Sequence, residues 1–450
     1  MKKGSGVPVK RDDGWMNIYT NQGIKGKDKQ LGSSFGAPLT FAETTLDDVY
    51  RGDGFTRRCI DLPTKEMVKN GFKVTGDTNG DITKYLAEKN LKAMLLQALQ
   101  WARIQGGNLM VLGINDGGNL EVPLNDKNIK DIEFFKNYDR HRVSWTTADL
   151  YSDVNHRLYG TPQFYTVTPL VAGLGVSNFR VHESRVIVFD GMSVSERARV
   201  ENDGWGDSYI QFMWTQLSNL AGAYFSAKNV IDDFIQTLLK VENLAQLLEN
   251  GQEDMIKKRL EILDMGRHTI NTMIVDAKED YEKSASSIAG MADLLDRFAE
   301  ALSAVTGIPV TLLMGRSPGG LNATGASDIQ FWYDSIAQDQ EAELLKPLTR
   351  ICYLTQLAKL GPTKGKLIEG WRVVFNSLWK PTDKETAETR KITADTDKLY
   401  IESGVLDPEE VAMSRFGGSE YSIETAIDLE NRRVSITEEE EPEEEEEVES

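Results

Sequence analysis

The chain has 450 residues, of which 40% are hydrophobic and 27% charged, the profile of a soluble globular protein large enough for two or three domains. Its formal net charge of −19 argues against a protein that grips nucleic acid over a broad basic surface. Cys59 and Cys352 stand far apart without metal spacing and favour reduced, buried thiols in a cytosolic protein. No hydrophobic run reaches the roughly 18 residues of a membrane span.

The first 40 residues are rich in Gly, Lys and Ser, a composition typical of a mobile arm. Their basic start, Met1–Gly6, lacks the hydrophobic region of a secretory signal. Ordered structure is predicted to begin near Thr44 and to continue as a helix through Phe55 and Leu62.

The stretch Asp77–Asp81 looks at first like a calcium-binding loop, because Glu88 falls at the twelfth position. The sixth position holds Ile82, however, where the sharp turn of such a loop needs glycine. We therefore predict a turn, followed by a helix that Asp81 caps and that runs to Ile104.

Residues 109–189 are predicted to contain most of the strands. Leu109–Ile114 has the pattern of a buried strand, and Asn115–Gly118 that of a hairpin turn. Turn clusters separate further short strands at residues 134–138, 143–145, 163–168 and 185–189. This pattern predicts an α/β domain with a mixed sheet.

Asp207 and Ser208 mark the start of a long helix that is expected to run to Phe234. A polar helix at residues 253–265 and a strand at residues 269–275 are predicted to follow.

Another long helix precedes the most distinctive segment. Hydrophobic residues recur at three- and four-residue spacing from Ile288 to Val305, and Gly307 and Pro309 end the helix. The loop Met314–Gly325 then holds four glycines and one proline, so its backbone can adopt angles closed to other residues.

A further helix is predicted after this loop, capped by Ser327 or Asp328 and striped with hydrophobic residues from Ile329 to Cys352. Pro347 lies inside that pattern, removes one backbone donor and is expected to kink the helix. Two helices joined by a glycine-rich loop are, by themselves, also what an ordinary packed hairpin contains.

Beyond this segment we predict a strand at residues 371–376, a helix from Asp383 to Ile401 and another that begins at Pro408. Residues 438–450 contain ten glutamates and are expected to form a disordered, self-repelling tail. Without these ten charges the net charge is still −9, which suits either a conduit through which DNA slides or a surface that is merely kept soluble.

No sequence motif of an enzyme is complete. The chain lacks the phosphate-binding Gly-x4-Gly-Lys-Ser/Thr pattern and the Gly-x-Ser-x-Gly pattern of a serine nucleophile. The four histidines, His141, His156, His182 and His268, are scattered without metal spacing. We therefore expect no catalytic, cofactor-binding or metal-binding residues and no cofactor.

The segment Gly307–Gly315, the glycine-rich loop and the long helix with aromatic residues closely resemble phage portal proteins, in particular a branch once catalogued only as a domain of unknown function. Asp61–Pro63, Val181–Phe189 and Gly204–Ser208 resemble the same family. The resemblance covers roughly residues 44–430.

This resemblance implies an α+β portal fold with a mixed α/β wing, a helical stem, a small α/β clip and a helical crown. The implied divisions are a flexible arm (1–40), the first part of the wing (41–206), a stem helix (207–234), the clip (235–285), a second stem helix (286–306), the tunnel loop (307–327), a long kinked helix with the return to the wing (328–380), the crown (381–436) and a disordered acidic tail (437–450).

The function that the resemblance implies is a ring of twelve subunits at one vertex of the capsid of a tailed phage or a prophage. Double-stranded DNA passes through the channel of such a ring during packaging and ejection. The implied partners are other copies of the chain, the terminase large subunit, the major capsid and scaffolding proteins, and neck or head-completion proteins, with no membrane. The implied location is the virion, reached from the host cytoplasm during assembly.

In portal proteins the tunnel loop points into the central channel. The residues that the resemblance places in this loop are Arg316, Ser317, Pro318, Gly319, Gly320, Leu321, Asn322, Thr324 and Gly325. Arg316 is either a contact for DNA phosphates or an ordinary exposed arginine, and both readings stay open.

Two other classes of function compete with the portal. Some proteins that share the family's N-terminal portion look like phosphoesterases that degrade cyclic oligonucleotide defence signals, and these need two facing His-x-Thr/Ser motifs to supply both acid and base. Here only His182-Glu183-Ser184 fits, so we expect a protein that is not an enzyme. The other competing class is a scaffold that only binds partners.

Overall fold

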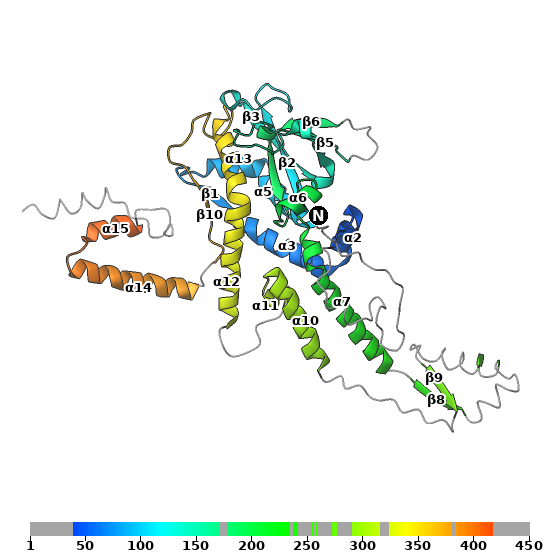
Figure 1. Ribbon diagram of the computed structural model, residues 1–450. Coiled ribbons are helices and arrows are strands. Elements are labelled where there is room, and N and C mark those ends of the chain that lie inside the picture. Colours follow the sequence, from blue (N-terminus) through cyan, green and yellow to red (C-terminus); the bar gives the residue numbers. More distant parts are fainter. Residues whose placement is uncertain are drawn as a thin grey trace, which may run out of the picture. The chain divides into compact units, whose positions relative to one another are not determined.

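The computed structural model describes residues 39–170, 178–234, 237–241, 254, 257–258, 272–276, 290–315, 324–379 and 383–416. The chain divides into a first unit that ends at Leu378 and a second unit that begins at Trp379. The first unit combines helices and strands, so the predicted mixed helix-and-sheet fold is confirmed (Figure 1). Among the described residues, no helix is both long and hydrophobic enough to cross a membrane.

The first unit contains the helices α2 (Glu43–Gly52), α3 (Gly54–Lys69), α4 (Asp81–Glu88), α5 (Leu91–Gln105), α6 (Glu196–Glu201), α7 (Tyr209–Phe234), α10 (Met291–Thr306), α11 (Val310–Met314), α12 (Thr324–Asp339) and α13 (Leu345–Leu357). A π-helical turn, Gln340–Leu344, joins α12 to α13. The strands are β1 (Phe72–Val74), β2 (Gly107–Asn115), β3 (Asp131–Asp139), β4 (Val143–Ser144), β5 (Phe164–Val167), β6 (Phe179–His182), β7 (Val186–Asp190), β8 (Thr237–Val241), β9 (Thr272–Asp276) and β10 (Val373–Phe375).

The start of α4 differs from the sequence prediction. Asp77, and not Asp81, caps this helix, because its carboxylate accepts hydrogen bonds from the backbone N–H groups of Asp81 at 3.0 Å and Ile82 at 2.9 Å. The helix expected to run to Ile104 is also interrupted: Asn90 has a φ of 59°, a left-handed conformation that separates α4 from α5.

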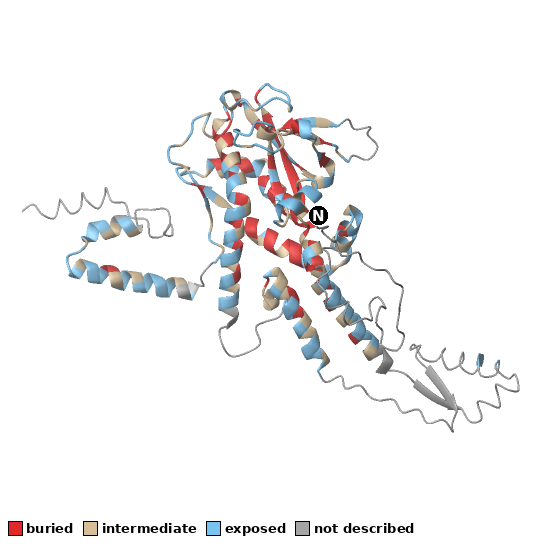
Figure 2. Cartoon of the chain, viewed as in Figure 1, coloured by how far each residue is buried: buried red, intermediate tan, exposed pale blue. Residues whose placement is uncertain are grey.

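Strand β2 is the centre of the main sheet and pairs antiparallel with β3 on one side and β7 on the other. Its residues 107–114 are all buried, since α5 covers one face and the sheet β4-β5-β6 contributes to a hydrophobic cluster with Leu109 and Val111. A strand covered on both faces explains the continuous hydrophobic run in the sequence. Figure 2 shows this buried centre.

The strand pairing corrects two predictions. The described pairs of the β2-, β4- and β1-containing sheets are all antiparallel, so the expected mixed sheet is wrong for this region; the pair β8-β9 is parallel. The turn at Asn115–Gly118 does not close a tight hairpin, because β3 begins only at Asp131.

A buried ion pair holds this long connection in place. Arg185 is fully buried, and its Nη2 lies 2.7 Å from Oδ2 of Asp116, while its Nε donates to the carbonyl of Val122 at 2.8 Å. Asp116 also accepts the backbone N–H groups of Gly118 and Asn125, both at 2.9 Å. The buried ion pair and these backbone contacts therefore hold the connection between β2 and β3, two strands that pair up to Asn115 and Asp131.

The predictions for both cysteines are confirmed: Cys59 and Cys352 are free and buried. Burial raises the pKa of each thiol to about 12, which keeps both protonated at neutral pH.

The second unit contains α14 (Asp383–Glu402) and α15 (Pro408–Phe416), close to the predicted bounds. Arg415 joins the two helices, since its Nε and Nη2 donate to the two carboxylate oxygens of Asp397 at 2.9 and 3.0 Å.

Candidate functional site

Helices α7 and α10 pack side by side and run in opposite directions (Figure 1). Helix α7 begins where the sequence predicts, with Ser208 Oγ accepting the backbone N–H of Ile210 at 3.1 Å. Helix α10 ends as predicted before Gly307, whose left-handed φ of 69° lets its N–H donate to the carbonyl of Ser303 at 2.8 Å.

Three chain segments cross tightly at the root of α7. A Cβ atom on Gly191 would lie 2.5 Å from the carbonyl oxygen of Asp207 and 2.6 Å from Cα of Gly106. One on Gly206 would lie 2.6 Å from the carbonyl of Met192. Backbone atoms therefore leave no room for a side chain at either position. The close packing of these three segments fixes the position of the start of α7 relative to the main sheet.

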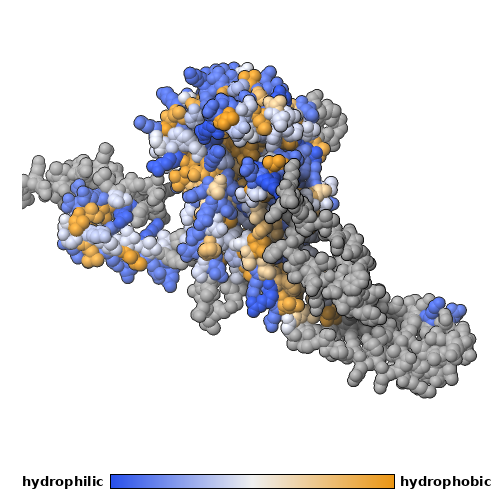
Figure 3. Space-filling model, in the orientation of Figure 1, coloured by the Kyte–Doolittle hydropathy of each residue, from blue (hydrophilic) through white to orange (hydrophobic). Residues whose placement is uncertain are grey.

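The inner faces of α7 and α10 share a hydrophobic cluster with α2, α3 and α11. Its buried members on α7 and α10 are Ile210, Met213, Leu217, Leu220 and Leu302, and α11 adds Leu313. Other large hydrophobic side chains on the same pair face away from the cluster: Phe212 is 49% exposed, Phe225 65% and Leu294 55%. In Figure 3 hydrophobic residues are visible along α10, interrupted by polar ones.

The base of the predicted tunnel loop is held from α3. Arg58 donates from Nε to the carbonyl oxygen of Leu312 at 3.0 Å and from Nη2 at 2.5 Å, and so binds a free carbonyl in the last turn of α11. Gly315 ends α11 with a φ of 67°. The sequence did not predict the short helix α11 or the contact from Arg58.

Most of the predicted loop residues, Arg316, Ser317, Pro318, Gly319, Gly320, Leu321 and Asn322, lie outside the described residues. Thr324 and Gly325 are the first two residues of α12. The helix thus begins before Ser327 and Asp328, and the prediction that one of these caps it is wrong.

The kink predicted at Pro347 stays a prediction. What the structure places directly before this residue is the π-helical turn, in which the N–H of Leu345 donates to the carbonyl of Gln340. The proline ring cannot sit under a regular α-helical carbonyl four residues earlier, that of Glu343, and a wider turn relieves this clash.

A buried arginine connects this turn to the other helices. Arg103, on α5, is 5% exposed, and its Nη2 lies 3.1 Å from Oε1 of Glu343 and 3.6 Å from Oδ2 of Asp339. Its guanidinium also lies over the ring of Tyr209, the first residue of α7, 4.9 Å from the centroid. Gln340 adds a hydrogen bond from Nε2 to the carbonyl of Met67 at 2.6 Å.

Burial and the cation of Arg103 shift the pKa values of the two carboxylates in opposite directions. Burial raises the pKa of Glu343 and of Asp339 above the ordinary values, although Arg103 acts in the other direction. Sequence reasoning missed Arg103, yet one signal was present: it follows Leu99 at the i+4 position of a hydrophobic helix stripe, where a charge needs a buried partner.

The described histidines occupy local structural roles. Nδ1 of His182 accepts the backbone N–H of Ser184 at 3.2 Å and lies 2.9 Å from its hydroxyl, and burial lowers the pKa of the ring. Nε2 of His141 lies 3.2 Å from Oε1 of Gln105, and His156 stacks on a tyrosine. Among the described residues no group of His, Cys, Asp and Glu side chains could hold a metal ion; His268 lies outside them.

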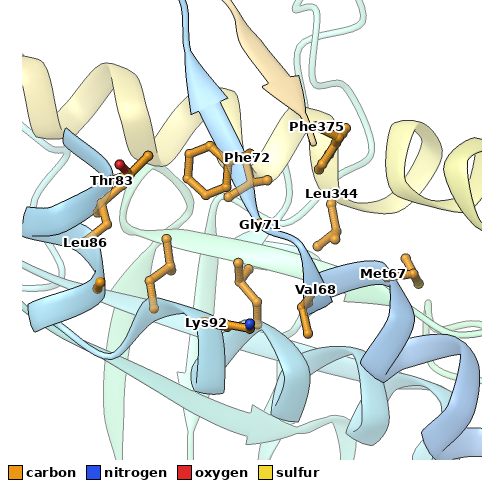
Figure 4. A pocket seen from close by; sticks show the side chains of 13 residues that line it. Met67, Val68, Gly71, Phe72, Thr83, Leu86, Lys92, Leu344 and Phe375 are labelled. Carbon is orange, nitrogen blue, oxygen red and sulfur yellow. The ribbon is translucent and has the colours of Figure 1, made fainter. Parts of the chain in front are cut away.

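One cavity, of about 170 Å³, lies between α3, α4, α5, β1 and the π-helical turn (Figure 4). Its lining is hydrophobic, with Phe72, Leu86, Leu344 and others, and the ammonium of Lys92 is engaged with the carbonyl of Lys69 at 2.8 Å. The hydroxyl of Thr83, which also lines the cavity, donates to the carbonyl of Gly80 at 2.8 Å, so both polar side chains of the lining are engaged with backbone. A hydrophobic cavity of this kind has few groups that would orient a substrate.

Comparison with known proteins places these elements in a family. Residues 44–399 match the family described as "Phage portal protein". The chain is 28% identical to the Anti-CBASS protein Acb1 of Caulobacter sp. (strain RHG1), over 85% of this chain and 62% of that protein. It is 26% identical to the Anti-CBASS protein Acb1 of Sphingomonas paeninsulae, over 89% of this chain and 64% of that protein. The chain thus spans less than two thirds of the length of either relative.

An uncharacterized protein of Haemophilus influenzae (strain ATCC 51907 / DSM 11121 / KW20 / Rd) is 24% identical and is matched over 93% of this chain and 94% of its own length. Among solved structures, a chain from the neck of the empty gene transfer agent particle covers 90% of this chain and 97% of its own, with 13% identity and a TM-score of 0.43. A chain from the neck of the native particle, computed with C12 symmetry, covers 85% of this chain and 96% of its own, with 14% identity and a TM-score of 0.44.

The match at residues 44–399 runs from α2 through the main sheet, both packed helices and the loop into α14, which is most of the sequence. The chain therefore belongs to the phage portal protein family.

Proposed function

We propose that this protein forms a ring of twelve subunits at one capsid vertex of a tailed phage or prophage, and that double-stranded DNA moves through the ring during packaging and ejection. The observation that carries the proposal is the family match, which includes α7, α10 and the loop that follows α11. The protein acts in the virion and reaches it from the host cytoplasm. It is a structural protein and not an enzyme.

The packed helix pair supplies the contacts for the ring. Phe212, Phe225 and Leu294 are about half exposed or more on helices whose other faces are already buried. Exposed hydrophobic side chains of this size are stabilised when a neighbouring copy covers them. A head-to-tail contact of this kind generates a closed ring when the rotation between subunits closes.

The loop supplies the narrowing of the channel. Its base is fixed by Arg58 and Gly315 at one end and by the start of α12 at Thr324 at the other. Between them lie Gly319 and Gly320, which give the loop conformations that other residues cannot adopt. The loops can then adjust separately as an asymmetric duplex passes through a symmetric ring.

The net charge of the chain favours DNA that moves through the channel over DNA that is bound tightly. A net charge of −19 repels phosphate, so DNA in the channel is not held by a broad basic surface. Arg316 is the basic residue that we place in the loop to contact passing phosphates. The partners that we propose for the two ends of the ring are the terminase large subunit, scaffolding and major capsid proteins, and neck or head-completion proteins.

Electron microscopy of the purified protein, together with light scattering after size exclusion, tests the ring. We expect annular particles whose mass is about twelve times that of one subunit. A monomer or a small oligomer at all protein concentrations would contradict the proposal.

Replacing Gly319 and Gly320 with valine tests the loop. The double variant is expected to form normal rings and to package less DNA, because β-branched residues restrict the loop backbone. A matched control is Gly54→Val at the start of α3, an exposed glycine outside both the loop and the helix pair, where no other side chain or distant backbone lies within 4 Å of an added Cβ. Unchanged packaging in the loop variant would remove the role that we assign to these glycines.

A second candidate function is the cleavage of cyclic oligonucleotide defence signals. It is favoured by the two relatives named Anti-CBASS protein Acb1. The site geometry is against it, because Nδ1 of His182 is engaged with Ser184 and the ring is buried. Incubation of the protein with cyclic oligonucleotides tests this function: cleavage that His182→Ala abolishes would establish it in place of a purely structural role.

A further inference from the structure

A groove of about 340 Å³ lies between α2, α3 and α7. Its floor is hydrophobic and comes from α7, with Trp214, Leu217 and Ala221. The opposite wall carries two carboxylates, Asp48 from α2 and Asp53 from the residue that precedes α3. Asp53 caps α3 through the N–H of Thr56 at 2.6 Å, whereas Asp48 is exposed. The groove thus combines a hydrophobic floor with an acidic rim.

The chain enters its described part at the edge of this groove. Residues 1–38 precede the first described residue, Leu39, and two residues later Phe41 packs edge-on against Trp214, with ring centroids 5.1 Å apart. The segment that comes before Leu39 therefore starts beside the groove floor.

The charge of this segment is opposite to that of the groove. Residues 1–38 contain six lysines and one arginine against three aspartates, a net charge of +4, while the remaining residues carry −23 to give the total of −19. Lys25, Lys27 and Lys29 alternate along the chain, so in an extended conformation the three ammonium groups lie on one side. Ile24, directly before them, offers a hydrophobic side chain for the floor.

We propose that residues 24–29 dock in the groove of their own chain, with the lysines toward Asp48 and Asp53 and Ile24 toward Trp214. Residues 30–38 connect this segment to Leu39 and include Gly32, Ser33, Ser34 and Gly36, residue types that linkers commonly use. A short flexible tether gives an effective concentration in the millimolar range, which favours the chain's own groove over that of another copy. This docking does not depend on ring formation.

A cysteine pair in the full-length chain tests the docking. Gly26→Cys places a thiol between the lysines, and Ser218→Cys places one at an exposed position of α7 that lines the groove. Mild oxidation is expected to give an intramolecular disulfide, seen as a faster-migrating monomer on a non-reducing gel. The native Cys59 and Cys352 are buried and serve as the background in the parent protein.

The control pair combines Gly26→Cys with Asn229→Cys, an exposed position on the same face of α7 and about 16 Å farther along the helix axis. Docking predicts that the Ser218 pair forms a disulfide much faster than the Asn229 pair. Equal rates in the two pairs would overturn the proposal. Disulfide-linked dimers in place of the intramolecular product would overturn the assignment to the chain's own groove.

Limited digestion with trypsin gives a measurement without engineered thiols. Docked lysines resist cleavage, so Asp48→Asn is expected to speed cleavage at Lys25, Lys27 and Lys29 by roughly threefold, the effect of one weakened exposed charge pair. Glu88→Gln, which alters another exposed carboxylate, on α4 and outside the groove, is the matched control and should leave the rate unchanged. Identical rates in Asp48→Asn, Glu88→Gln and the parent protein would overturn the role of the acidic rim.

Discussion

Nη2 of Arg103 lies 3.1 Å from Oε1 of Glu343, and this contact joins two residues that are 240 positions apart in the sequence. Because the same guanidinium lies over the ring of Tyr209, one buried charge touches α5, the start of α7 and the π-helical turn after α12. The helix that follows the loop and the helix pair therefore share one anchor.

Replacing Arg103 with methionine should lower the free energy of unfolding by about 3 kcal/mol. The substitution leaves the carboxylates of Glu343 and Asp339 partly buried without a cation. The free-energy cost of these unpaired charges is larger than the net attraction that the ion pair contributes. A urea titration followed by tryptophan fluorescence measures the change. The double variant Arg103→Met/Glu343→Met is the control, and it should recover most of the loss because no unpaired charge remains at position 343.

The effect of Arg103→Met should depend on pH with a defined sign. Burial holds the pKa of Glu343 above its ordinary 4.5, so ionising this group already favours the unfolded state, and removing the arginine strengthens that tendency. The difference in stability between parent and variant is therefore largest near neutral pH and narrows as pH falls toward 4.5. A difference that grows on acidification would contradict this account.

Asp116→Asn should destabilise the main sheet by about 3 kcal/mol, since it leaves the fully buried Arg185 without its counter-ion. The pKa of Asp116 is shifted in the opposite direction to that of Glu343, so its ionised form stabilises the folded state. Burial acts to raise the pKa of Asp116, but the N–H groups of Asn125 and Gly118 and the cation of Arg185 together hold it below 3.8. The stability that the ionised group contributes is present above pH 3.8 and is lost only as pH falls through the lowered pKa.

Thermal unfolding at several pH values checks the prediction for Asp116. Asp126→Asn, an aspartate on the same connection without a buried partner, is the control and should change stability by less than about 0.5 kcal/mol. A variant at position 116 that is as stable as the control at neutral pH would contradict the role of the buried pair.

Local patterns predicted the helices and strands well where one face of the element decides its conformation. The bounds expected for α7 and the cap expected after α10 at Gly307 agree with the structure, because amphipathic spacing and a terminal glycine are local signals. The break at Asn90 was missed, since a continuous leucine stripe hides a single left-handed residue.

Long-range contacts could not be read from the sequence. Arg103 and Glu343, or Arg185 and Asp116, are ordinary charged residues until the fold buries them together. The pairing of β2 with both β3 and β7 is a matter of topology, so the expected mixed sheet was wrong although most of its strands were located correctly. The resemblance to portal proteins predicted the family correctly, because the amino-acid sequence around the loop is specific to that family, whereas hydrophobic periodicity is common to many folds.

Gly191→Ala should destabilise the first unit by several kcal/mol, about 3 or more. The added methyl carbon would lie 2.5 Å from the carbonyl oxygen of Asp207, which is backbone and cannot move without shifting the root of α7. The matched control is Gly222→Ala inside α7, where no atom lies within 4 Å of the added carbon. Alanine there should stabilise the helix by about 1 kcal/mol.

Calorimetric unfolding of both glycine variants measures these effects. Opposite signs for Gly191→Ala and Gly222→Ala are expected. A Gly191→Ala variant that unfolds at the temperature of the parent protein would show that the crossing at the root of α7 can relax.

Pro347→Ala should restore a backbone donor within α13 and remove the proline ring that would clash with the carbonyl of Glu343 in a regular α-helix. Two contacts hold the π-helical turn in its present register, from Gln340 to the carbonyl of Met67 and from Arg103 to Glu343. We therefore expect stability to change by less than about 1 kcal/mol, while amide hydrogen exchange in residues 343–348 becomes several-fold slower.

Lys346→Ala, at an exposed neighbouring position, is the control and should leave that exchange unchanged. If Pro347→Ala instead destabilised the protein by several kcal/mol, the proline would be required for the turn itself. The wide turn would then be set by the proline ring, and the contacts of Gln340 and Glu343 would follow from it.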